Sequence, residues 1–94
     1  MKTLNLSIEL SNMAFEAAEQ SMSQHELLGK VGDILHLHPE VLGKPTGSSK
    51  QQKSLGNDLR LSEYHFDYEQ HSVHVKFANF LPRGDWEVQD IRLV

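Results

Sequence analysis

The sequence predicts an α+β fold, with an N-terminal strand, one bent helix or a helix pair, and then a three-stranded antiparallel meander. Three observations predict it. Residues 4–10 alternate apolar and polar side chains, residues 13–35 carry apolar side chains at helical spacing, and residues 64–93 alternate again. Such a change of period is typical of helices that are segregated from an antiparallel sheet, so we expect the helices to pack on one face of it.

The first expected element is a strand over residues 4–10. Its apolar side chains fall on every second position, as in a half-buried strand. They are Leu4, Leu6, Ile8 and Leu10. The pattern does not determine which strand this segment joins.

The next expected elements are helical and end before residue 39. Apolar residues between 13 and 22 form one stripe, and those between 27 and 35 form a second stripe that is out of phase with the first. Ser23 followed by Glu26 has the spacing of a capping box. We therefore expect two helices, or one helix bent near residues 21–23. Pro39 disfavours helical geometry at the residue before it and ends the second helix.

Residues 43–57 read GKPTGSSKQQKSLGN and predict a flexible basic loop within a single domain, residues 1–94. The segment lacks hydrophobic periodicity, and a loop of this length in a compact domain is usually mobile or functional. Its Gly, Lys, Ser and Thr residues are those of phosphate-binding loops. Their order is wrong, because Gly-Lys comes first and Pro45 interrupts the segment.

The last third of the chain predicts the meander. With a turn centred on residues 70–71, one register places the apolar residues of the first hairpin on one face. The expected pairs are Tyr68 with Val73, Phe66 with Val75 and Tyr64 with Phe77. The apolar phase then slips between Val88 and Ile91, which predicts a β-bulge near Gln89 and Asp90.

Composition and charge narrow the class of function. The chain has no cysteine and a net charge of −4, and its N-terminus lacks the apolar stretch of a signal peptide. We therefore expect a cytoplasmic protein without a membrane span. Residues 1–43 hold six acidic and two basic residues, whereas the predicted loop region is basic. This distribution favours a protein partner over nucleic acid.

Two sets of charged residues are candidate contacts with a partner. Phe80 is a candidate apolar contact, because the alternation of its predicted strand places it on the same face as polar residues. The acidic surface expected to bind a partner comprises Glu16, Glu19, Glu26 and Asp33. The basic loop contacts, which would serve a nucleic-acid or phosphate binder, are Lys44, Lys50, Lys53 and Arg60.

The polar face of the predicted hairpin carries His65, Asp67 and His74. Two imidazoles and a carboxylate are a ligand set of zinc and iron sites. An exposed face needs polar side chains in any case, and Asp67 opposite His74 would serve as a cross-strand charge pair. We interpret the set as a solvated face and expect neither a metal nor another cofactor.

No catalytic motif is present: Ser62 and Ser72 lack the strained turn of a nucleophile. We therefore expect a non-enzymatic protein-binding module, with room for a homodimer. Small, acidic, cysteine-free chains are common among the accessory proteins of phages and plasmids, including those that inhibit host defence proteins. That resemblance rests on size and charge alone. The alternative is a nucleic-acid or nucleotide-phosphate binder that uses residues 43–57.

Overall fold

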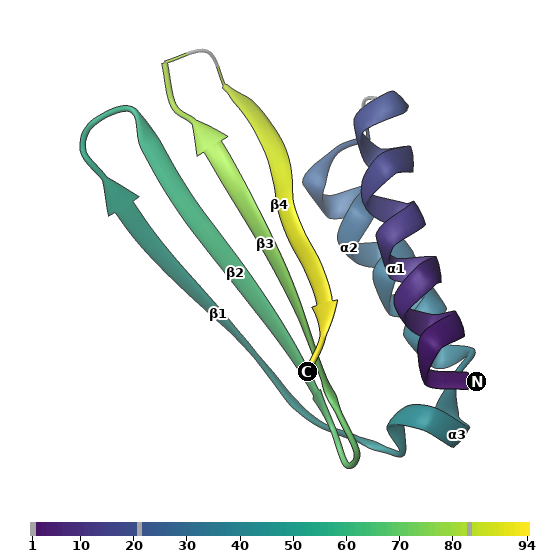
Figure 1. The fold of residues 1–94 in the computed structure, drawn as a ribbon. Coiled ribbons are helices and arrows are strands. Elements are labelled where there is room, and N and C mark those ends of the chain that lie inside the picture. Colours follow the sequence, from purple (N-terminus) through teal and green to yellow (C-terminus); the bar gives the residue numbers. More distant parts are fainter. Residues whose placement is uncertain (1, 21, 83) are drawn as a thin grey trace.

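The computed structural model describes residues 2–20, 22–82 and 84–94. Within these residues two helices precede a short third helix and a four-stranded antiparallel sheet (Figure 1). The helices are α1 (Lys2–Glu19), α2 (Gln24–His36) and α3 (Pro39–Leu42). The strands are β1 (Pro45–Leu55), β2 (Leu59–Tyr68), β3 (Ser72–Phe80) and β4 (Asp85–Leu93). The fold class α+β is confirmed, whereas the predicted N-terminal strand and three-stranded meander are wrong.

Residues 4–10, predicted as a strand, belong to helix α1. Leu6 and Leu10 are completely buried, but Leu4 and Ile8 are 57% and 50% exposed. Burial thus follows a spacing of four residues rather than two, as a helix requires. Leu6 and Leu10 continue into the half-buried or buried residues 13, 14 and 17, which form one helical stripe. The alternation over residues 4–10 is part of this longer apolar stripe, and the stripe as a whole has the spacing of a helix rather than of a strand.

The expected break between two helices is confirmed, and Ser23 defines the start of the second. Its side chain accepts a hydrogen bond from the Glu26 backbone N–H at 3.1 Å, which satisfies one of the unpaired N–H groups at the start of α2. Helix α2 ends at His36, before Pro39 as predicted, and Pro39 begins the short helix α3. Residue 21, one of the three residues at which the sequence predicts a bend, lies outside the residues that the structure describes.

Replacing Ser23 by alanine is expected to lower the free energy of unfolding by about 0.5–2 kcal/mol, because α2 loses its N-terminal cap. Ser23→Asp is the matched control, since an aspartate carboxylate can accept the same hydrogen bond. Urea denaturation followed by circular dichroism measures both variants. Equal losses from the two substitutions would show that the hydroxyl does not act as a cap.

Residues 45–55, predicted to lie in a flexible loop, form strand β1 instead. All eleven of its residues are exposed, so β1 has no apolar face and no hydrophobic period to read. Antiparallel backbone pairing with β2 holds β1 in place. A tight turn at residues 56–58 connects the two strands. Gly56 has a φ of 77°, a conformation that glycine adopts without steric strain.

The register between β2 and β3 differs from the predicted one by two residues. Tyr64 lies opposite Val75 and Phe66 opposite Val73. A shift of two preserves the face of every side chain, so the predicted apolar face of the hairpin is right although its pairs are wrong. The predicted bulge is confirmed: the pairing of β3 with β4 slips between Lys76 and Phe77, which leaves Gln89 without a partner in the register.

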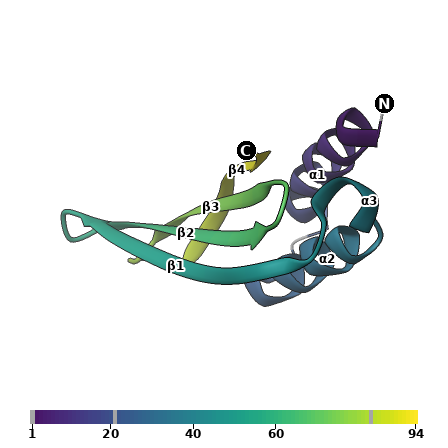
Figure 2. The ribbon, with the colours of Figure 1, turned by 90° about the horizontal axis from the view of Figure 1, so that it is seen from below.

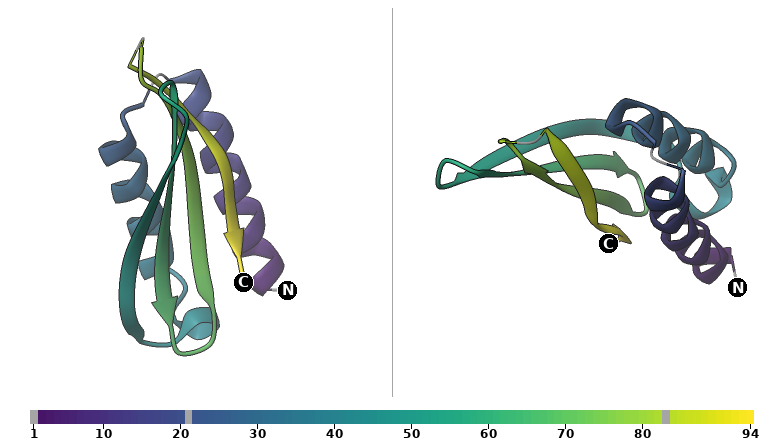
Figure 3. Two further views of the ribbon diagram at one scale, coloured as in Figure 1. Left: turned by 90° about the vertical axis from the view of Figure 1, so that its left-hand side faces the viewer. Right: turned by 90° about the horizontal axis from the view of Figure 1, so that it is seen from above.

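The hydrophobic core lies between the helices and one face of the sheet (Figure 3). It combines helical residues such as Leu10 and Leu35 with Val75, Phe77 and Ile91 of β3 and β4. Helix α1 packs on β4, and the half-buried aromatic residues of β2 border the core. Among the described residues, no helix combines the length and apolar character needed to cross a bilayer.

Candidate functional sites on the sheet

The sheet has two faces with different surroundings. One face, called the helix face here, carries the core residues Val75 and Phe77. The other, called the outer face, carries Glu63, His65 and His74, which are half-buried. Side chains alternate between the faces along each strand. The outer face and the free edge of β1 hold the polar groups that the helices leave uncovered.

The outer edge of β1 is the first candidate site. The sheet order is β1-β2-β3-β4, so β1 pairs with β2 along one side only, and no other described element pairs with it. The β1–β2 hairpin extends away from the helices, with its tip at the far end of the sheet (Figure 2). An exposed edge of this length offers a row of backbone groups to another extended chain.

Two backbone hydrogen bonds of β2 and its flanking turn identify which backbone groups of β1 point outward. The Tyr68 N–H donates to the His71 carbonyl, and the Leu81 N–H donates to the Asp58 carbonyl, both across the β2–β3 ladder. Backbone groups alternate along an antiparallel strand, so even-numbered residues of β2 bond to β3 and odd-numbered ones to β1. Past the first residue of β1, its odd-numbered residues lie opposite the odd-numbered residues of β2, so their backbone N–H and C=O groups point toward β2. The backbone groups on the outer edge are those of Ser48, Lys50, Gln52 and Ser54.

The four candidate basic contacts do not form one surface. Lys50 lies opposite Tyr64 on the helix face, and its ammonium group is 5.1 Å from the centre of that ring. Arg60 is on the same face, because it lies opposite Ser54, whereas Lys53 is opposite Leu61 on the outer face. Lys44 precedes β1, and its backbone N–H donates to Glu69 Oε1 at 2.8 Å. A single phosphate-binding patch would need these cations together.

The four candidate acidic contacts are exposed residues of the two long helices. Glu16 and Glu19 lie on α1, and Glu26 and Asp33 lie on α2. Lys30 is also exposed and lies at a spacing of four residues from Glu26 and three from Asp33. Residues at these spacings are neighbours on a helix surface, so Lys30 reduces the negative charge of α2 there.

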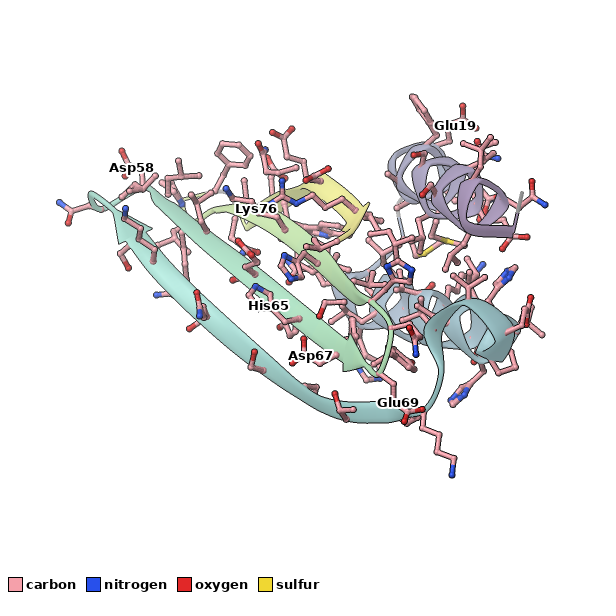
Figure 4. The ribbon with its side chains drawn as sticks, turned by 60° about the horizontal axis from the view of Figure 1, so that its bottom comes forward. Glu19, Asp58, His65, Asp67, Glu69 and Lys76 are labelled. Carbon is pink, nitrogen blue, oxygen red and sulfur yellow. The ribbon has the colours of Figure 1, made fainter. Side chains whose placement is uncertain are left out.

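A cluster of Glu63, His65 and His74, called the His–Glu cluster here, is the second candidate site. One potential metal-ligand atom from each residue lies within 4.8 Å of the others. His65 and His74 are opposite each other in the register, and their rings stack with centroids 4.0 Å apart. Figure 4 shows His65 and Asp67 in succession along β2, with Lys76 on the neighbouring strand.

Asp67, which the sequence placed in the metal-ligand set, does not belong to this cluster. The two-residue change of register puts it opposite Ser72, whose hydroxyl donates to Asp67 Oδ1 at 2.8 Å. The same change brings His65 rather than Asp67 opposite His74. Glu63, which lies two residues before His65 on the same face, supplies the carboxylate instead. The alternation of β2 places Glu63 on this face, but only the true register brings it within reach of His74.

Electrostatics favour the charged form of the Glu63 carboxyl. A hydrogen bond from His65 lowers the pKa of Glu63 below its usual value, and the Lys76 ammonium, together with the imidazoles of His65 and His74 whenever they are protonated, acts in the same direction. Partial burial acts in the opposite direction. The Glu63 carboxylate accepts from His65 Nε2 at 2.6 Å. His74 Nδ1 is buried without a hydrogen-bond partner and lies 3.7 Å from Glu63 Oε1.

A small hollow of about 190 Å³ opens beside this cluster. Its other lining residues come from β3 and β4, and they include two cations and one further carboxylate. Asp90 Oδ2 lies 3.5 Å from Arg92 Nε, so these two charges oppose each other. Lys76 lies opposite both Glu63 and Asp90 in the register. The hollow thus holds charges of both signs.

Phe80, the candidate apolar contact, is half-buried and lies opposite Leu59. Leu61 follows on the same outer face, opposite the buried Ala78. Leu55 completes the group, since it is opposite Leu59 in β1 and is 43% exposed. Phe80 therefore belongs to an apolar group at the distal end of the outer face.

Sequence reasoning missed the free edge of β1, because a strand that buries no side chain has no apolar period. It also missed Glu63, because the assumed register put it out of reach of His74. Comparisons with protein-family models, curated proteins and solved structures find nothing similar to this chain.

Proposed function

We propose that this protein is a non-catalytic protein-binding module that pairs an extended, acidic segment of a partner protein along the outer edge of β1. The observation that carries the proposal is the exposure of all eleven residues of β1, whose second edge pairs with no described element. Addition of a strand to a free sheet edge is a recurring mode of peptide recognition, in which backbone hydrogen bonds supply affinity.

Charge selects the kind of segment that fits. Strand β1 contains Lys50 and Lys53 and no acidic residue. A second copy of this chain paired through β1 would bring the lysines of both strands together, and like charges opposite each other are destabilising. An acidic strand would instead place carboxylates beside both lysines. We therefore place any homodimer contact away from this edge.

The acidic helix surface supports a second form of the same class of function. Exposed Glu16, Glu19, Glu26 and Asp33 would contact a basic partner, as an inhibitor of a nucleic-acid-binding host protein does. The edge of β1 has the stronger support, because Lys30 interrupts the acidic residues of α2 whereas β1 is uniformly free of acids. A cytoplasmic location, which the lack of cysteine suits, belongs to the same proposal.

The test selects peptides from a displayed random library on the immobilised full-length protein and measures their binding by fluorescence polarisation. The expected peptides are extended and rich in Asp and Glu. Gln52→Pro removes one outward N–H and no ladder hydrogen bond, since edge strands tolerate proline there. It is expected to weaken binding about three- to tenfold, because the net loss of one backbone hydrogen bond is about 0.5–1.5 kcal/mol.

Charge variants supply the matched controls. Lys50→Glu combined with Lys53→Glu is expected to abolish binding of the acidic peptides, whereas Lys30→Glu on the exposed surface of α2 leaves it unchanged. Peptides that bind Gln52→Pro as well as the original protein would overturn the proposed edge. Basic peptides that are lost on charge reversal of the helix acids would favour the acidic surface.

A duplex oligonucleotide is measured in parallel. Tight binding of it, with an affinity that falls steeply with salt, at a slope of about 0.9 per phosphate contact, would establish the nucleic-acid alternative and reject the protein-binding proposal.

A further inference from the structure

We propose that the His–Glu cluster of Glu63, His65 and His74 is a binding site for a divalent transition-metal ion, with Zn²⁺ as the ion its ligands suit best. The site is independent of the edge of β1. Two imidazoles and one carboxylate are a three-ligand set of zinc sites that keep one position open to water or to a further ligand.

Distances support a shared ion. Zinc bonds of about 2.0–2.1 Å in tetrahedral geometry separate neighbouring ligand atoms by about 3.3 Å. Glu63 Oε1 lies 2.6 Å from His65 Nε2 and 3.7 Å from His74 Nδ1, so the two separations bracket that value. The third separation, between the ligand atoms of His65 and His74, is no more than 4.8 Å, so the three atoms lie close enough for one ion once the rings are oriented toward it.

The second, independent observation is the state of His74. Its Nδ1 atom is buried, and it has no hydrogen-bond partner. Buried polar atoms without a partner are rare, and a bound ion is one recognised reason for them. At 3.7 Å the Glu63 carboxylate is too far to form a hydrogen bond with this nitrogen. An ion between the two atoms would satisfy both.

Binding requires the two stacked rings to turn. Their planes are 10° apart, and a metal ion lies in the plane of each imidazole that binds it. Two parallel rings 4.0 Å apart therefore cannot share an ion until at least one rotates about its Cβ–Cγ bond. The side chains of His65 and His74 are 21% and 20% exposed, which leaves room for the rotation. A neutral imidazole binds a metal through its unprotonated nitrogen, so the proton that His65 Nε2 donates to Glu63 must move to Nδ1 of the same ring if Nε2 is the ligand.

Neighbouring charges set the strength of the site. Arg92 lies opposite His74 and Lys76 opposite Glu63, and both cations oppose a bound ion. Asp90 lies opposite Lys76 and 3.5 Å from Arg92, so it offsets part of their charge.

The test titrates ZnCl₂ into the full-length protein by isothermal titration calorimetry at pH 7.5. One Zn²⁺ per chain is expected. His74→Ala and Glu63→Gln are each expected to weaken binding at least about tenfold, since loss of even an outer-shell partner commonly costs 10–100-fold. His25→Ala, at an exposed histidine of α2, is the control for incidental histidine binding and is expected to leave the affinity unchanged.

Lys76→Gln is expected to increase the affinity for Zn²⁺, a result that would not follow if the His–Glu cluster had only a structural role. Removing this cation is expected to tighten Zn²⁺ binding about three- to tenfold, because it stands beside the ligand carboxylate. Zinc-induced shifts in the ring resonances of His65 and His74 in NMR spectra locate the ion in the original protein, and the dispersion of the amide resonances without zinc shows whether each variant folds. Zinc binding that survives His74→Ala, or that His25→Ala removes, would overturn the proposal, as would the absence of any binding.

Discussion

Replacing Phe77 by alanine is expected to lower the free energy of unfolding by about 3–5 kcal/mol, the cost of removing a large buried aromatic side chain. Phe77 is completely buried at the centre of β3. Its ring meets those of Tyr64 and Trp86 edge to face, with centroids 5.8 Å and 5.5 Å away. Such aromatic pairs add about 0.5–1.5 kcal/mol each beyond the buried area. Small domains have only about 5–15 kcal/mol of stability, so the loss is a large part of the total.

Guanidinium denaturation, followed by circular dichroism and by the fluorescence of Trp86, measures this loss. Trp86 is the only tryptophan of the chain, so its fluorescence reports on one site. Phe15→Ala makes the same chemical change at a residue of α1 that is 71% exposed, and is expected to alter stability by no more than about 0.5 kcal/mol. Similar losses for the two variants would contradict the position of Phe77 in the core.

A comparison of the stability losses caused by alanine at residues 8 and 10 distinguishes a helix from a strand in the N-terminal segment. Leu10→Ala is expected to cost about 2–5 kcal/mol, because Leu10 is completely buried between α1 and the rest of the core. Ile8→Ala is expected to change stability by less than about 0.5 kcal/mol, because Ile8 is 50% exposed. In a strand, residues 8 and 10 would share one face, and both substitutions would be costly.

Thermal denaturation of the two variants at equal concentration provides the comparison. A difference of at least about 6 °C in melting temperature is expected, since the two losses differ by at least about 1.5 kcal/mol and 1 kcal/mol shifts a domain of this size by about 4–8 °C. Equal and large losses would restore the strand that the alternation of residues 4–10 predicts. Equal and small losses would place the whole segment outside the core.

The fold was predictable where side-chain burial leaves a pattern. The cap at Ser23, the helix end before Pro39 and the bulge beside Gln89 all rest on local chemistry or on apolar phase, and the structure confirms them. The alternation from Leu4 to Leu10 led to the wrong prediction of a strand, because the buried stripe of a helix with exposed apolar neighbours produces the same short pattern. A seven-residue window cannot separate the two periods when both faces carry leucine.

The candidate sites were predictable only in part, for a different reason. Apolar phase assigns His65 and His74 to the outer face, but registers that differ by two residues satisfy that phase equally well. The distinction between Asp67 and Glu63 as the third member therefore depends on turn geometry, which the sequence around residues 69–71 leaves open. Strand β1 left no trace in the hydrophobic pattern because it is exposed on both faces.

The meander order of the sheet has a consequence for how the molecule opens. Strands β2 to β4 share the core, whereas β1 adds a backbone ladder and no buried side chain. Regions with few buried apolar contacts undergo local unfolding at a free energy far below that of global unfolding. Strand β1 can therefore detach and re-form while the core stays intact. Strand β1 is therefore expected to be the first strand to leave the sheet, and occupancy of its outer edge by another strand would reduce the population of that open state.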